Sequence, residues 1–276
     1  MVEVNNVSFA YKTEPLFSGL SLDLDVGNIY GLFGLNGAGK TTLLNIISGL
    51  LFPKKGDCKL LGRPTAQRDV ETLRNIYVLP EKFNLPDVKP QQYVNLHAPF
   101  YPDFDETYYR ELVNTLKITP DKQLQELSYG QRKKFLICFA LATNCRLLLM
   151  DEPTNGLDIP SKSQFRKIIA AADNTQRCIV ISTHQVRDLE TLIDHLTVLN
   201  DGQIIFQQSL EEISKTLGFE EVSDNQMPHV LYSEEIFGGH KVILPKEKTD
   251  RDSQVDLELL FNGIVQHSET INKAFK

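Results

Sequence analysis

No long hydrophobic run is present in this sequence of 276 residues. A membrane-spanning helix needs roughly 18 or more consecutive apolar residues, and no stretch approaches that length. The first residues, MVEVNNVSFAYKTE, have neither the basic segment nor the apolar segment of a signal peptide. We therefore expect a cytoplasmic protein that has no membrane-spanning segment of its own.

Cysteine and positive charge are both scarce. The four cysteines are Cys58, Cys138, Cys145 and Cys178. They are scattered, without a CxxC pair, so we expect buried reduced thiols and neither disulfides nor a metal site. The net charge of −7 and the pI near 5.4 argue against a nucleic-acid binder, which would usually present a basic face. The chain is long enough for one large domain, or for one domain with an appendage.

The most informative stretch is GLNGAGKTT, residues 34–42, which matches the pattern G-x-x-x-x-G-K-[ST]. Residues 28–33 before it have the composition of a short buried strand. Residues 42–48 after it predict a helix that Gly49 ends. A strand, a glycine-rich loop and a helix in this order are what a phosphate-binding loop requires. A chance glycine-rich turn is the alternative, and the flanking elements disfavour it.

The chemistry of such a loop assigns roles to its residues. Its backbone N–H groups and the start of the helix would surround the phosphates of ATP. Lys40 would reach the β- and γ-phosphates, and the Thr41 hydroxyl would bind Mg²⁺. The candidate nucleotide contacts here are Gly34, Asn36, Gly37, Ala38, Gly39, Lys40, Thr41 and Thr42.

Polar residues follow two further apolar runs. Residues 146–150 predict a central parallel strand that ends at Asp151 and Glu152. Asp151 would hold Mg²⁺ through water opposite Thr41, and Glu152 would orient or deprotonate a water molecule. A second strand, residues 178–182, leads to His184, which could contact the γ-phosphate. Each of these could instead be structural: a polar loop start, or a histidine at a strand end.

Other candidate contacts are open to two interpretations. Tyr11 could stack on an adenine ring or could be a packed surface tyrosine. Ser128 and Gln131 have the spacing of a capping box, which predicts a helix start, and such a start could also bind an anion.

The predicted fold class is an α/β P-loop NTPase core with three additions. An antiparallel β layer precedes the core, and proline-punctuated residues 83–127 predict an inserted helical subdomain with Asp105 as a helix cap. Residues 219–276 predict a small α+β extension, in which an apolar stripe over 257–265 forms a helix. The predicted domains are therefore 1–218 and 219–276.

In this order the motifs resemble those of an ATP-binding-cassette (ABC) ATPase, the nucleotide-binding subunit of a transporter of the bacterial export type. The resemblance covers about residues 1–217, and its motifs are Tyr11, GLNGAGKTT, Glu81, LSYGQ (127–131), LLLMDEP, Asp158 and His184. It implies that Ser128, Gly130 and Gln131 contact ATP held by a second protomer, and that Asp158 links the two sites. It also implies that Glu152 is the general base and that His184 and Lys40 act with it on the γ-phosphate.

Two positions depart from the family pattern. Tyr129 replaces the first glycine of LSGGQ, although Gly130 is retained. Glu81 replaces the usual glutamine, and a glutamate can still reach Mg²⁺ but cannot donate as an amide does. We therefore count Glu81, with Thr41 and Asp151, among the expected metal contacts.

The resemblance implies ATP and Mg²⁺ as cofactors and a transmembrane permease subunit as a partner. It further implies a homodimer, or pairing with a paralogous cassette, on the inner face of the plasma membrane, without nucleic acid. The alternative is a soluble cassette ATPase that acts on ribosomes or DNA. Such proteins usually carry two cassettes or long coiled coils, and this sequence has one cassette and no sustained heptads. A degenerate regulatory cassette is opposed by the intact Lys40, Asp151, Glu152 and His184.

Overall fold

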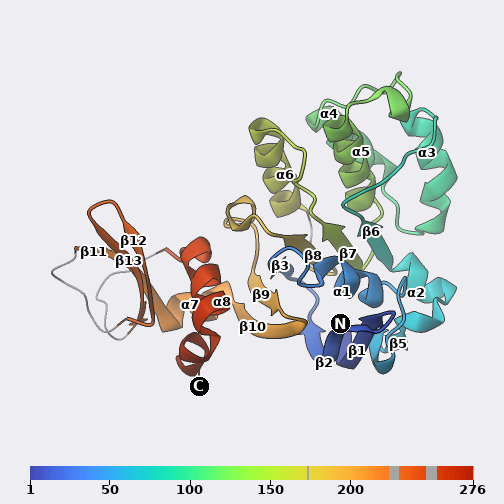
Figure 1. Ribbon diagram of the computed structural model, residues 1–276. Helices are drawn as coiled ribbons and strands as arrows, with labels where there is room; N and C mark the ends of the chain where they lie inside the picture. Colours follow the sequence, from blue (N-terminus) through green and yellow to red (C-terminus); the bar gives the residue numbers. More distant parts are fainter. Residues whose placement is uncertain (173, 224–229, 247–253, 276) are drawn as a thin grey trace.

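The computed structural model describes residues 1–276 except 173, 224–229, 247–253 and 276. Its centre is a sheet of six strands (Figure 1). In spatial order the strands are β10 (Gln203–Ser209), β9 (His195–Asn200), β3 (Ile29–Phe33), β8 (Cys178–Thr183), β7 (Leu147–Asp151) and β6 (Ile76–Leu79). All neighbours pair in parallel except β10 with β9. The pairing sets Phe33 beside Thr183 and Asp151 beside Ser182, so three strands end at one edge.

The predicted N-terminal layer is present as an antiparallel sheet. Its strands are β2 (Glu14–Leu24), β1 (Val2–Tyr11), β4 (Lys55–Leu60) and β5 (Arg63–Pro64). Helix α1 (Lys40–Ile47) shares one buried cluster with this layer and the central sheet, through Leu43 and Ile47. Because α1 is buried against both sheets, its N-terminus and the loop before it are held in a fixed place.

The helical region lies at one end of the molecule, beyond β6 (Figure 1). Its elements are α3 (Pro90–His97), η2 (Ala98–Phe100), α4 (Glu106–Thr115), η3 (Leu124–Glu126), α5 (Tyr129–Ala142) and α6 (Ile159–Ala171). Asp105 caps α4 as expected, since its carboxylate accepts from the Tyr108 N–H at 2.8 Å. Helix α4 packs against α5, which begins beyond the predicted subdomain boundary at 127.

The C-terminal residues form a separate small sheet, β11 (Leu217–Val222), β13 (Gly239–Pro245) and β12 (Tyr232–Ile236). Strand β11 begins directly after α7 (Leu210–Thr216). The apolar stripe predicted over 257–265 lies in α8 (Leu257–Lys273), which packs between this sheet and β9–β10 (Figure 1). The observed α/β fold with its added layers confirms the predicted fold class. None of the helices among the described residues is long and apolar enough to span a membrane.

Candidate active site

The glycine-rich loop adopts a conformation that only glycine tolerates at two positions. Gly39 caps α1 with φ of 106°, and a Cβ atom there would lie 2.8 Å from the Phe17 ring. At Gly34 a Cβ atom would lie 2.4 Å from the Leu199 carbonyl oxygen. The loop therefore runs against packed neighbours and leads into the positive end of α1, which is the arrangement that binds phosphate.

Lys40 is the first residue of α1 and is buried beside this loop. Its Nζ donates to the carbonyl oxygens of Gly34 at 2.7 Å and Leu35 at 3.3 Å. Burial lowers the pKa of Lys40, and the carboxylates of Glu152 and Asp151 oppose that shift. These carboxylates favour the ammonium form, which is the form that binds phosphate.

Thr41 and Asp151 meet across the edge of the central sheet. The Thr41 hydroxyl donates to Asp151 Oδ2 at 2.6 Å, and the Ser182 hydroxyl donates to Oδ1 of the same carboxylate. No group of three or more His, Cys, Asp or Glu side chains in the described part of the chain could hold a metal by itself. One hydroxyl and one carboxylate fit Mg²⁺, which takes oxygen ligands and usually keeps waters and substrate phosphates for the rest.

Glu152 follows Asp151 in a backbone conformation that is unusual for its residue type, with φ of 46°. Its Oε1 accepts from the His184 backbone N–H at 3.1 Å and lies 2.7 Å from His184 Nδ1. Its Oε2 accepts from the Thr183 hydroxyl at 3.1 Å. These contacts fix the carboxylate, and they leave Nε2 as the ring nitrogen of His184 available to a ligand.

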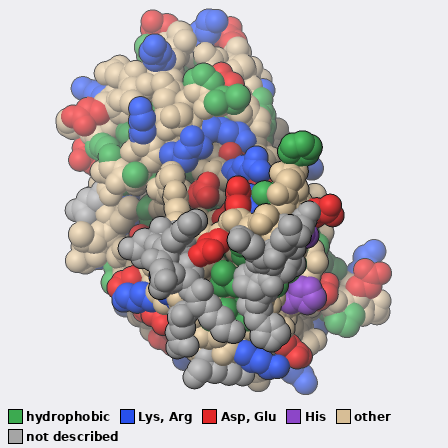
Figure 2. Space-filling model, turned by 90° about the vertical axis from the view of Figure 1, so that its left-hand side faces the viewer, with side chains coloured by type: hydrophobic (Ala, Val, Ile, Leu, Met, Phe, Trp, Pro, Cys, Tyr) green, Lys and Arg blue, Asp and Glu red, His purple; other side chains and the backbone are tan. Residues whose placement is uncertain are grey.

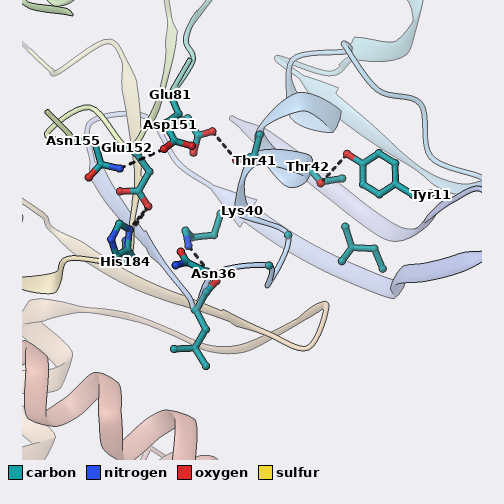
Figure 3. A pocket seen from close by; sticks show the side chains of 14 residues that line it. Tyr11, Asn36, Lys40, Thr41, Thr42, Glu81, Asp151, Glu152, Asn155 and His184 are labelled. Carbon is teal, nitrogen blue, oxygen red and sulfur yellow. Dashed lines mark hydrogen bonds and ion pairs between the residues drawn. The ribbon is translucent and has the colours of Figure 1, made fainter. Parts of the chain in front are cut away.

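These side chains line one cavity of about 500 Å³ (Figure 3). Its lining includes Tyr11, Asn36, Gly37, Gly39, Lys40, Thr41, Thr42, Glu81, Asp151, Glu152 and His184. Gly34 and Ala38 are absent from that lining; the Ala38 N–H donates to the Leu35 carbonyl within the loop. The polar residues expected from three separate strand ends are thus brought together.

Tyr11 lies at the outer side of this cavity (Figure 3). Its hydroxyl is 3.1 Å from Thr42 Oγ1, and its ring packs edge-on against Phe9 at 5.0 Å. About half of the side chain is exposed, at 51%. The tyrosine is therefore held at its hydroxyl and one edge, while much of its ring is accessible to a planar ligand.

Four further expected contacts lie outside the cavity. Ser128 Oγ accepts from the Gln131 N–H at 3.3 Å, and Gln131 Oε1 accepts from the Ser128 N–H at 3.3 Å, which is the predicted capping box. Asp158 caps α6 by accepting from the Ser161 N–H at 2.9 Å. The residues of these helix starts, Gly130 included, do not line the cavity of their own chain.

Lys133 is a site residue that the sequence did not reveal. It is fully buried, and its Nζ donates to the carbonyl oxygens of Glu152 at 2.8 Å and Asn155 at 2.9 Å. Burial lowers the pKa of Lys133 to about 8. It lies between Arg132 and Lys134, a run that favours a solvated helix face, so only the fold identifies it as a support for Glu152.

Comparison with known proteins identifies the family of this chain. A family model described as ABC transporter matches residues 17–155, which is half of the chain. The cobalt import ATP-binding protein CbiO of Salmonella paratyphi A is 31% identical over 232 residues, covering 77% of this chain and 82% of that protein. The ABC transporter ATP-binding protein YtrB of Bacillus subtilis is 29% identical over 220 residues, covering 78% and 74%. The Nod factor export ATP-binding protein I of Cupriavidus metallidurans is 28% identical over 219 residues, covering 77% and 72%.

Solved structures of ATP-binding cassettes share the fold of this chain. The ATP-binding subunit of an ABC transporter superposes with a TM-score of 0.69 at 25% identity, covering 77% of this chain and 91% of that one. The ATP-binding cassette MJ0796, solved as a dimer bound to ADP and Pi, has a TM-score of 0.67 at 24% identity, covering 76% and 99%. This chain therefore belongs to the ABC transporter family, as an ATP-binding subunit with ATPase activity.

Proposed function

We propose that two copies of this chain enclose two ATP molecules with Mg²⁺ and that hydrolysis drives a separate transmembrane permease. The main support is the division of the motif residues. Lys40, Asp151 and Glu152 face one cavity, whereas Ser128 and Gly130 lie at a helix start outside it. A second chain, related by a two-fold axis, would bring that helix start to the phosphates. The dimeric state of the cassette MJ0796 supports the same assembly. A paralogous cassette could take the place of the second copy.

ATP would bind with its base on Tyr11 and its phosphates on the loop of residues 34–42. The N–H groups at the start of α1 would bind the β-phosphate, and Lys40 would turn from its two carbonyl partners to the β- and γ-phosphates. Thr41 and Asp151 would hold Mg²⁺, with Glu81 in reach from the same cavity. Bound Mg²⁺ would neutralise charge that develops on the phosphate oxygens.

Glu152 would accept the proton of the attacking water. It is buried, and three hydrogen bonds from Thr183 and His184 hold its carboxylate in one orientation. Lys133 fixes the backbone carbonyl of the same residue. His184 would contact the γ-phosphate through Nε2 while its Nδ1 stays on Glu152. Orientation of this kind accounts for much of the efficiency of a general base.

The permease would dock between the α/β core and the helical region. A groove of about 690 Å³ lies there, at the end of α1, at α2 (Val70–Arg74) and at η2. Its apolar lining includes Leu50, Val70, Leu73, Val78, Phe100 and Tyr101. Leu50, Val70 and Phe100 are 51%, 61% and 67% exposed. Because Arg68 and Arg74 also line this groove, its occupant would be a short amphipathic helix with apolar anchors and an acidic residue.

Docking of this kind would put the chain in the cytoplasm, on the inner face of the plasma membrane, and would need no nucleic acid. The net charge of −7 supports this view. On the side that carries the C-terminal unit, basic side chains gather with acidic side chains directly beside them (Figure 2). A soluble cassette acting on ribosomes or DNA would instead need a surface suited to a polyanion.

We assign residues 1–218 to the ATPase domain, with 83–127 as its helical subdomain, and 219–276 to an accessory C-terminal region. Strand β11 begins at Leu217 and pairs with β13, which supports an accessory region that begins at Leu217.

Crosslinking tests the docking site directly. The native cysteines are all buried, so one introduced cysteine gives a single reactive thiol on the surface. Val70→Cys and Phe100→Cys should crosslink to a co-expressed membrane protein. Phe237→Cys is the matched control, because Phe237 is fully exposed at the β12–β13 turn, outside the groove. Crosslinks from the groove exclusively to ribosomal proteins would replace the transporter proposal with the ribosomal one.

Export is the direction we propose, on the basis of Glu81 and of the resemblance to the Nod factor export protein. The cobalt import protein is equally similar, so direction needs its own measurement. Inverted membrane vesicles, which expose the cytoplasmic face, should accumulate the substrate when ATP is added outside. Accumulation only in right-side-out vesicles loaded with ATP would assign import.

A further inference from the structure

Tyr129, the residue that departs from the family motif, links the start of α5 to the backbone beside the nucleotide cavity. It is the first residue of α5, directly after the cap Ser128. Its ring stacks on Phe83 at 5.2 Å with an angle of 15°. Its hydroxyl donates to the Glu81 carbonyl oxygen at 2.7 Å. A glycine at this position could make neither contact.

One edge of the ring lies close to the segment after Glu152. A Cβ atom added at Gly156 would lie 2.9 Å from the Tyr129 ring, so the backbone approaches the ring closely. The Nζ atom of Lys133 lies 5.4 Å from the ring centroid and also binds the carbonyls of Glu152 and Asn155. Tyr129, Phe83, Lys133 and Gly156 form what we call the Tyr129 cluster. It joins three segments that are distant in sequence.

Two of those segments carry side chains of the nucleotide cavity. Glu81 and Asn155 point toward one another, with Asn155 Nδ2 donating to Glu81 Oε1 at 3.5 Å (Figure 3). Both residues line the cavity. Burial, and then the charge of Glu81, raise the pKa of Tyr129, so its hydroxyl stays protonated and continues to donate.

We propose that Tyr129 is a positioning residue that couples the orientation of Glu81 to the start of α5. Any movement of the Glu81 backbone that accompanies ATP–Mg²⁺ binding would be transmitted through the hydroxyl bond and the Phe83 stack to Ser128 and Gly130. Those residues would then be presented to the second protomer only when the cavity of their own chain is filled. The proposal rests on the assignment of Glu81 to the nucleotide site.

Fluorescence tests this coupling, because the sequence contains no tryptophan. Phe83→Trp introduces a single indole into the Tyr129 cluster, and its emission should change as ATP–Mg²⁺ is added, with the Kd that calorimetry gives. Adding Tyr129→Phe should reduce the amplitude by about half or more while Kd stays within about twofold, since one hydrogen bond outside the cavity is lost. Tyr108→Phe, on α4, is the matched control and should change neither.

Equal amplitudes with and without Tyr129→Phe would overturn the proposal, as would an unresponsive indole in a protein that binds ATP by calorimetry. Failure of ATP to bind in calorimetry would instead overturn the assigned nucleotide site, and this proposal with it. The two failures are therefore distinguishable.

Steady-state kinetics separate coupling from a merely structural role. Tyr129→Phe keeps the ring and should lower kcat by about 2- to 12-fold, the range of one neutral hydrogen bond, with KM unchanged within about twofold. In a Glu81→Ala background, Tyr129→Phe should lower kcat by less than about a further twofold. Both variants interrupt the same connection between the nucleotide cavity and the start of α5. Losses that simply add would show that Tyr129 acts independently of Glu81, and would overturn the proposal.

Discussion

The phosphate loop and the start of α5 use similar residue types in opposite ways. At the phosphate loop, Lys40, Thr41 and the strand ends converge on one cavity, where Lys40 and Asp151 are buried and hydrogen-bonded to neighbouring groups. At the start of α5, the side chains of Ser128 and Gln131 each bond the other's backbone, and neither lines that cavity. The first region has the groups to bind and hydrolyse a nucleotide, whereas in the proposed dimer the second acts on the partner's ATP.

This difference indicates how the chemistry is divided in the proposed dimer. Residues that bind ATP should act within one chain, and residues of the α5 start should act on the partner's ATP. Substitutions in the first region should therefore alter chemistry or affinity in an isolated chain. Substitutions in the second should alter only what depends on assembly.

Glu152→Gln should give the largest effect. The amide cannot accept a proton from water, so kcat should fall by about 10²–10⁴, while ATP binding persists. A radiolabelled ATP assay gives kcat, and calorimetry gives Kd. Lys40→Ala is the contrasting variant in the same region and should weaken binding itself. Hydrolysis at the wild-type rate by Glu152→Gln would remove Glu152 from the role of general base.

Gly130→Val should give a smaller effect of a different kind. A Cβ atom at Gly130 would lie 3.3 Å from the Gly156 carbonyl oxygen, and a branched side chain would cover the N–H groups of the helix start. Loss of these donors should lower kcat by about 10²-fold. ATP affinity of the isolated chain should stay within about twofold, because Gly130 does not line the cavity. A matching loss of ATP affinity would contradict the division between the two regions.

Much of the local structure of both regions could be predicted from sequence because local patterns determine it. The glycine-rich loop, the apolar runs before Asp151 and before His184, and the spacing of Ser128 and Gln131 all specify local structure. Parallel strands then end at one edge, so the side chains at their ends meet. These features were confirmed in the fold.

Tertiary contacts could not be predicted in the same way. The bond from Tyr129 to Glu81 joins residues 48 positions apart, and no local pattern records it. Lys133 is buried because two carbonyl oxygens satisfy its ammonium group, although its charged neighbours favour a solvated helix face. Gly218 lies in β11, which pairs with a strand more than 20 residues later, and no local pattern records that pairing either.

The smallest expected effect is on the pH dependence of the free energy of unfolding, through Lys133, which bonds the Glu152 carbonyl. Burial lowers the pKa of Lys133 to about 8, from 10.5 for an unperturbed lysine. Between these values the unfolded chain binds more protons, so the free energy of unfolding should rise as the pH increases from about 8 to about 10.5. Lys133→Met should flatten this rise in chemical denaturation, and Lys134→Met, the control, should preserve it. If the free energy of unfolding of Lys133→Met rose with pH as steeply as that of the wild type, Lys133 would not be the cause of the rise.

Light scattering of Glu152→Gln with ATP and Mg²⁺ tests the division of the site most directly. The chain has a mass of 31.3 kDa, and the variant should retain ATP without hydrolysing it. We predict twice that mass when ATP and Mg²⁺ are present and a return to 31.3 kDa when Gly130→Val is added. A mass of 31.3 kDa at saturating ATP in both proteins would contradict the account.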